Sequence, residues 1–149
     1  MVTDDNRLLE TIKSNLEDLA SLTIKVGVQG DEAVAQYGDE KGVTVADVAV
    51  FNEYGTGRIP ARPFMRETIE QTDNWAAESA KVHNAVIDGI DPYVAAELLG
   101  QQAASDVQNT IYDGDFVPNS PSTIKKKGSS KPLIDTTQLV GSITYTVEE

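Results

Sequence analysis

The chain has 149 residues, with 24 acidic against 12 basic side chains and a formal net charge of −12. This length suits a single domain with a real core. An acidic surface repels duplex phosphates, because DNA-binding proteins ordinarily present a basic face. The chain has no cysteine, which excludes disulfides and thiolate sites, and its one histidine, His83, excludes a His-based zinc cluster. No stretch approaches the roughly 18 apolar residues of a membrane helix, and the acidic N-terminus is unlike a secretion signal.

The N-terminal segment has apolar residues at helical spacing, followed by an alternating stretch. The residues on one helix face are Leu8, Ile12, Leu16 and Leu19. Asp4 or Asp5 can cap the first amides of this helix. Apolar and other residues then alternate over Leu22–Val28, which predicts a strand with one buried face. Residues 30–42 are polar and contain glycine, which predicts a loop or an irregular hairpin.

A short helix and a proline-rich turn are predicted next. Thr44 and Asp47 resemble a capping box ahead of a helix over Val45–Tyr54, and Gly55 ends it. Two prolines exclude helix over residues 59–62, since each disfavours the helical conformation in the residue before it. The residues of this helix available for the core are Val48, Ala49 and Phe51.

Two long helices and a terminal strand complete the prediction. Helical spacing favours one helix over Phe64–Ile87 and another over Tyr93–Tyr112. Residues 113–135 are rich in proline, glycine and serine, which predicts an exposed loop. A short helical turn over Thr136–Val140 and a strand over Ser142–Val147 follow.

These elements predict an α+β fold in one domain over residues 1–149. An antiparallel sheet is packed by two long helices, with an N-terminal helix and a long loop extension before the C-terminal strand. A loop of about 20 residues is uncommon inside a compact domain unless it has a function. Docking of residues 113–135 into a neighbouring subunit would be such a function, because burial at the interface offsets the cost of ordering.

The basic residues are clustered in two places. Three arginines fall within nine residues and four lysines within seven: Arg58, Arg62, Arg66, Lys125, Lys126, Lys127 and Lys131. Two interpretations stay open. The clusters are solvated patches, or they meet acidic faces of other copies and steer self-association.

No residue pattern indicates catalysis or metal binding. Glu53, His83 and Asp135 are the obvious titratable candidates, and their spacing matches no known acid–base or nucleophilic arrangement. His83 is expected to be an ordinary surface residue. The paired acids lack the spacing of an EF-hand loop, and residues 55–57 lack the Lys-Ser/Thr of a phosphate-binding loop. We therefore expect no enzyme, no metal and no cofactor.

Two segments resemble a known family. NEYGTGRIPARPFMRETI, residues 52–69, and PNSPSTIKKKGSSKPLIDTTQLVGSITYTV, residues 118–147, resemble phage virion-morphogenesis proteins of the tail-completion and head–tail joining group. In that group Asn-Glu-Tyr/Phe-Gly precedes Ile-Pro-Ala-Arg-Pro-Phe, and Pro-Leu precedes Asp-Thr-Gly-x-Leu near the C-terminus. Thr137 stands here in place of the usual glycine.

The resemblance implies a structural protein of the phage neck. Such a subunit forms a homo-oligomeric ring, with a hexamer favoured and a dodecamer possible, and it meets other neck and tail proteins. DNA would pass through the ring without sequence-specific binding, and the protein would be made in the bacterial cytoplasm and reside in the virion. The alternative is a small acidic interaction module or inhibitor outside the virion.

Several residues of these segments suit a subunit interface. The side chains around Tyr54 can satisfy loop amides or simply cap a turn, and Phe64 is expected to anchor a helix in the core. Arg62 can reach a carboxylate, within the chain or in another subunit, in preference to a phosphate. Lys125–Lys131 can also touch phosphates. The interface hypothesis comprises Asn52, Glu53, Tyr54, Arg58, Arg62, Phe64, Arg66, Lys125, Lys126, Lys127, Lys131 and Asp135.

Overall fold

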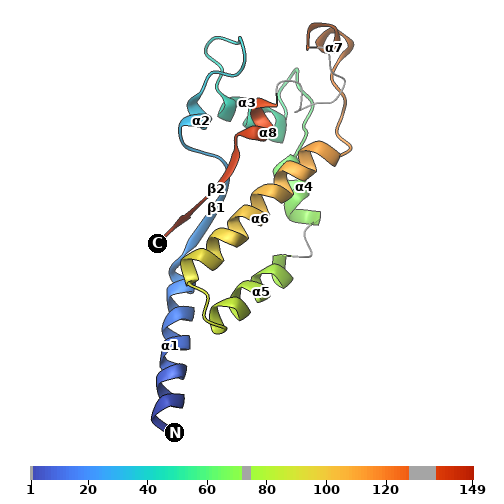
Figure 1. The fold of residues 1–149 in the computed structure, drawn as a ribbon. Coiled ribbons are helices and arrows are strands. Elements are labelled where there is room, and N and C mark those ends of the chain that lie inside the picture. The colour runs from blue at the N-terminus through green and yellow to red at the C-terminus, as the bar shows by residue number, and fades with distance from the viewer. Residues whose placement is uncertain (1, 72–74, 128–136) are drawn as a thin grey trace. The chain divides into compact units, whose positions relative to one another are not determined.

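The computed structural model describes residues 2–71, 75–127 and 137–149 (Figure 1). The fold is α+β, and the strands described form one antiparallel sheet of two, β1 and β2. The elements in chain order are α1 Val2–Ser21, β1 Thr23–Val28, α2 Gly30–Val34, α3 Val45–Tyr54, α4 Phe64–Gln71, α5 Trp75–Ile87, α6 Pro92–Asp113, α7 Pro121–Lys127, α8 Gln138–Gly141 and β2 Ile143–Glu148.

The chain divides into two compact units. The first comprises Met1–Lys25, Thr72–Ala103 and Tyr145–Glu149. The second comprises Val26–Gln71 and Ala104–Thr144. A single domain over residues 1–149 stays a prediction.

The first unit is built on α1, α5 and the first half of α6. α1 packs against α5, and Val86, Ala95 and Ala96 are buried. The helix α6 comes very close to β2 at Gly100, where an added Cβ would lie 2.5 Å from the ring of Tyr145.

The second unit carries most of the buried side chains. α3 contacts α2, α4 and α8. A single bridge between Gln36 and Thr44 pairs the chain antiparallel after α2. The buried apolar residues of this unit are Tyr37, Val45, Phe64, Ala104, Val107, Ile111, Leu139, Val140 and Ile143.

Most predicted elements are confirmed, and helix α3 most fully. The Thr44 hydroxyl accepts from the Asp47 amide at 3.1 Å, and the Asp47 carboxylate accepts from the Thr44 amide at 2.9 Å. The capping box is therefore present. Gly55 ends the helix with φ 74, in the left-handed region that favours glycine.

The helix expected over Phe64–Ile87 is described as α4 and α5, and its continuity over residues 72–74 lies outside the described residues. Three other local predictions need correction. α1 begins at Val2, so Asp4 and Asp5 lie within the helix and do not precede it. Residues 30–42 include α2, whose first turn carries acidic residues that the helix dipole favours. The predicted loop over 113–135 contains α7.

The inward face of α3 also differs from the prediction. Phe51 is 37% exposed, whereas Asn52 and Glu53 are buried. The buried polar side chains have hydrogen-bond partners, which makes their burial tolerable.

Candidate functional site

The turn between α3 and α4 is held by local hydrogen bonds. The amide of Thr56 donates to the carbonyl of Ile59 at 2.8 Å, and the amide of Ile59 donates to the Thr56 hydroxyl at 3.0 Å. A Cβ at Gly55 would lie 2.9 Å from the backbone nitrogen of Ala61, so the two sides of the turn are very close. The turn is therefore a fixed corner of the second unit.

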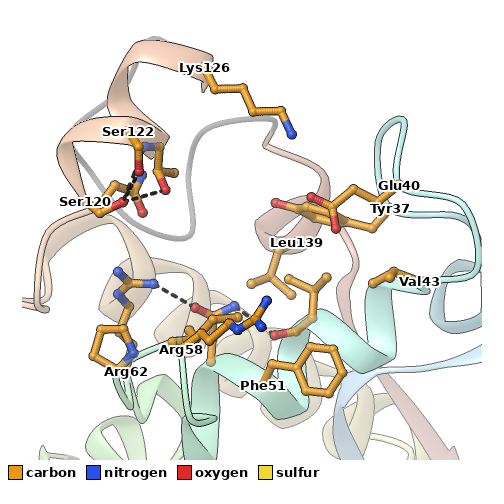
Figure 2. A pocket seen from close by; sticks show the side chains of 16 residues that line it. Tyr37, Glu40, Val43, Phe51, Arg58, Arg62, Ser120, Ser122, Lys126 and Leu139 are labelled. Atoms are coloured by element: carbon orange, nitrogen blue, oxygen red, sulfur yellow. Dashed lines mark hydrogen bonds between the residues drawn. The ribbon is translucent and has the colours of Figure 1, made fainter.

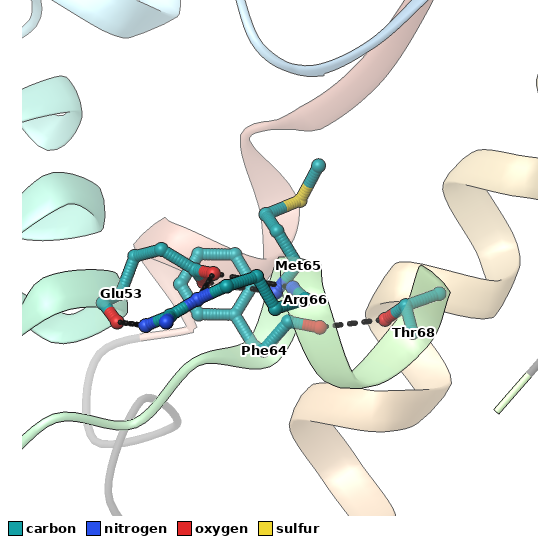
Figure 3. Close-up of polar contacts among 5 residues, drawn as sticks. All are labelled: Glu53, Phe64, Met65, Arg66 and Thr68. Carbon is teal, nitrogen blue, oxygen red and sulfur yellow. Dashed lines mark hydrogen bonds and ion pairs between the residues drawn. The ribbon is translucent and has the colours of Figure 1, made fainter. Parts of the chain in front are cut away.

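Glu53 joins the end of α3 to the start of α4 (Figure 3). Its carboxylate accepts from the amides of Met65 at 2.9 Å and Arg66 at 3.1 Å, two groups that the helix itself leaves unpaired. The same carboxylate pairs with Nε of Arg66 at 3.0 Å. The Arg66 guanidinium also lies 5.3 Å from the ring centroid of Tyr54. Glu53 thus satisfies amides as expected, but these amides belong to α4 and not to the loop.

Arg62 connects the corner to a distant part of the chain. Its Nε donates to the carbonyl of Val117 at 2.7 Å, and its Nη2 donates to the carbonyl of Pro118 at 3.3 Å. Its Nη1 donates to Oδ1 of Asn52 at 3.1 Å. The Asn52 amide in turn donates to the Val48 carbonyl at 2.8 Å. The guanidinium therefore holds residues 117–118 against the end of α3.

Arg62 forms no salt bridge with any residue that the structure describes. The residue is 7% exposed, and its partners in the described part of the chain are uncharged oxygens. Backbone carbonyls suit the guanidinium because it presents donors in a planar fork. Burial lowers the pKa of Arg62 from its ordinary value, although arginine keeps its charge in proteins.

A pocket of about 480 Å³ opens beside this corner (Figure 2). Of the described residues, three cations line it, Arg58, Arg62 and Lys126, against one carboxylate, that of Glu40. Its other lining residues are apolar or carry hydroxyl and amide groups: Tyr37, Val43, Val48, Phe51, Asn52, Ile59, Pro60, Asn119, Ser120, Ser122, Thr123 and Leu139. The pocket is a locally basic place on an acidic chain.

The structure brings some of the predicted site residues together and separates others. Four line the pocket: Asn52, Arg58, Arg62 and Lys126. Glu53, Tyr54 and Arg66 lie together where α4 begins. Phe64 is 1% exposed, which confirms it as a core anchor. Lys125 and Lys127 lie on α7, whereas Lys131 and Asp135 lie outside the described residues.

Sequence reasoning missed the pocket residues Tyr37 and Glu40 and the carbonyls of residues 117–118. Nothing local connects these positions, since Val117 is 55 residues from Arg62. The sequence does contain a signal for α7. Serine is favoured as the N-cap of a helix and proline as its first residue, and Ser120 and Pro121 hold these positions. The Ser120 hydroxyl accepts from the Thr123 amide at 3.3 Å, as such a cap would.

The described residues show neither a metal cluster nor a membrane span. Across residues 2–71, 75–127 and 137–149, no three acidic or histidine side chains gather as metal ligands. No helix in the same ranges is long and apolar enough to cross a membrane. His83 is exposed, with Nδ1 2.6 Å from the Ser79 carbonyl oxygen, which confirms the expected surface position.

Comparison of the chain with models of known protein families, with curated proteins and with solved structures gave no match.

Proposed function

We propose that the chain is a structural virion protein, a tail-completion or head–tail joining subunit of a tailed phage. Copies form a homo-oligomeric ring in the neck, connecting tail to head around the DNA channel. A hexamer is favoured, to match the sixfold tail tube, and a dodecamer would match the portal. The partners are other neck and tail proteins.

One observation carries the proposal. The two family-like segments, residues 52–69 and 118–147, meet at the same pocket, and Arg62 of the first bonds the carbonyl of Pro118 in the second. In a chain of this length, two unrelated chance resemblances have no reason to share a structural corner. The meeting of the segments supports a common role for them.

The backbone at Thr137 adds support. The resemblance places glycine at this position, and Thr137 has φ 56, in the left-handed region that glycine favours. A β-branched residue there is strained. The local backbone thus has the conformation that a family glycine would require.

The fixed corner suits assembly. A preorganised surface loses little conformational freedom on binding, so more of the contact energy appears as affinity. The bonds of Glu53 to α4 and of Arg62 to residues 117–118 supply this order before any partner arrives.

The net charge of −12 suits a channel for DNA. Acidic walls repel the duplex and let it slide without sticking. We expect the purified protein to bind duplex DNA weakly at all salt concentrations. Tight binding that weakens steeply with salt, measured by fluorescence anisotropy, would contradict this part of the proposal.

The decisive experiment removes the coding sequence from the phage genome that carries it. Filled heads and separate tails are expected by electron microscopy, and supply of the protein from a plasmid should restore joined particles. Antibody labelling of restored particles should place the protein at the neck. Normal infectious particles without the protein would refute the proposal, and its absence from particles would favour an interaction module or inhibitor.

A further inference from the structure

Within the described ranges, the cations of the pocket have no carboxylate partner. Arg58 and Lys126 form no ion pair with any described residue, and Arg62 bonds only uncharged oxygens there. Arg62 uses three of the five N–H donors of a guanidinium. Arg58 and Lys126 are exposed, so a carboxylate from another molecule can reach both. The pocket therefore favours a carboxylate supplied from outside it.

The same pocket presents apolar side chains to the ligand. Val43, Val48 and Leu139 contribute to its lining. Phe51 lines it as well and remains 37% exposed. A ligand that fills the pocket would thus carry an apolar side chain close to a carboxylate.

The first half of α1 has this chemistry. All residues from 5 to 11 are exposed, and Leu8 and Leu9 are 59% and 64% exposed. Asp5 and Glu10 flank the leucines, and neither forms an ion pair with a described residue. A helical stretch whose side chains are exposed, as over residues 5–11, has little to stabilise it beyond its own propensity. Adjacent exposed leucines on such a helix indicate a surface that is covered in the assembled state.

We infer that residues 5–11 of one copy dock into the basic pocket of the next copy. Leu8 and Leu9 meet the apolar lining, and Asp5 and Glu10 face Arg58 and Lys126. The two surfaces are different, so the contact is head-to-tail, and such contacts generate rings when the rotation closes. The inference rests on the proposed function for the ring and deepens it by naming the surfaces that meet.

The lack of cysteine in the chain permits a direct test. Leu9→Cys protein is mixed with Ser122→Cys protein under mild oxidation, with Ser122 in the lining of the pocket. The mixed disulfide is expected to accumulate, because such a bond requires the two Cα atoms to come within about 7 Å. The matched control pairs Leu9→Cys with Asn109→Cys, an exposed position on α6 that does not line the pocket. Equal yields of the two mixed disulfides would overturn the inference.

Charge reversal tests the charge complementarity of the same contact. One variant carries Asp5→Lys with Glu10→Lys, and the other carries Arg58→Glu with Lys126→Glu. All four residues are exposed, so both variants should keep the circular dichroism of the wild type. The first set is added to the Leu9→Cys protein and the second to the Ser122→Cys protein. When only one of the two proteins carries its set, the yield of the mixed disulfide should fall about tenfold. Reversal on both partners should restore it.

The restoration distinguishes docking between copies from docking within one. If α1 reached the pocket of its own chain, restoration would need both sets on the same polypeptide, and this result would overturn the inference. The inference would also be overturned if the mixed disulfide were lost whenever either partner is reversed and did not return when both are reversed.

Different experimental outcomes would contradict the docking of residues 5–11 and the proposed function. A phage whose particles still require the protein, but whose joining is unaffected by Leu8→Gln with Leu9→Gln, would retain the function and lose the docking. Replacement of both leucines is otherwise expected to weaken self-association roughly a hundredfold. A specific mixed disulfide from a protein absent from particles would retain the docking and remove the function.

Discussion

Arg62 lies inside the second unit and joins three oxygens from two parts of the chain that are far apart in sequence. The planar guanidinium suits this task because its donors have fixed directions. The side chain therefore acts as a cross-link between the α3 end and residues 117–118.

We expect Arg62→Lys to destabilise the protein although it preserves the charge. A lysine ammonium is a compact point charge that cannot span the three acceptors, and buried acceptors would lose their partners. The expected loss is about 2 kcal/mol in the free energy of unfolding, measured by urea denaturation. Arg58→Lys is the control, since Arg58 is exposed and its substitution should change stability by less than about 0.5 kcal/mol. Equal effects of the two substitutions would contradict this role.

Asp47 gives the protein a predictable response to acid. Hydrogen bonds from the backbone amide and the hydroxyl of Thr44 lower the pKa of Asp47. The unfolded state then binds more protons near the ordinary pKa of about 3.9, so this contribution to stability is present above that pH. It is lost as pH falls through the lower folded-state pKa.

Asp47→Asn should therefore alter the pH dependence of unfolding. The stability difference between wild type and variant should be largest above about pH 5 and should shrink as pH falls below about 4. Urea denaturation across this range measures it. A difference that stays constant, or grows, on acidification would show that Asp47 does not stabilise the cap as a carboxylate.

Among the elements, the turn after α3 depends on a glycine for two separate reasons. Gly55 has φ 74, and a Cβ there would meet the backbone of Ala61 at 2.9 Å. We expect Gly55→Ala to cost about 2 kcal/mol or more, from left-handed backbone strain together with the clash. Gly57→Ala is the matched control, because a Cβ at Gly57 meets nothing within 4 Å. Thermal unfolding of both variants should show a large loss only for the first.

At the turn before α8, a substitution to glycine is expected to stabilise the protein. Thr137 has φ 56 and is exposed. Thr137→Gly should raise stability by about 0.5–1 kcal/mol, because relief of left-handed strain exceeds the added freedom of glycine in the unfolded chain. Thr144→Gly, at an exposed strand position, should lower stability instead. A loss of stability in the Thr137 variant would show that its side chain makes a contact worth more than the strain.

The elements that could be predicted from sequence are those specified by nearby residues. The α3 helix follows from the Thr44 and Asp47 cap and from Gly55, all within a few residues of its ends. The strands follow from alternation. The site could be predicted only in part, because the hydrogen bonds of Arg62 to Val117 and Asn52 depend on tertiary packing. The apolar character of Phe51 predicts a core position, whereas the hydrogen bonds of the buried Asn52 and Glu53 reach residues 10 and 12 positions away.

For the whole molecule, the distribution of charge matters more than its sum. A net charge of −12 keeps separate copies apart by repulsion. The pocket has the opposite local charge, since its described lining residues include three cations and one anion. Self-association of such a chain is favoured only where a basic surface can meet an acidic one, which restricts the copies to few relative orientations.

The segment after α6 allows a test of assembly separate from folding. None of residues 120–126 is buried, so the core does not depend on them. We expect deletion of residues 120–131 to leave a folded protein that no longer assembles, because the deletion removes Lys126 and the hydroxyl side of the pocket. Circular dichroism and a single cooperative unfolding transition report the fold, and incorporation into particles reports assembly.

A variant with the same residues replaced by a Gly/Ser sequence of equal length separates loss of these side chains from shortening of the connection. Both variants should be excluded from particles. Incorporation of the deletion variant at the wild-type level would show that this segment is dispensable for assembly, while the resemblance of residues 52–69 would still require explanation.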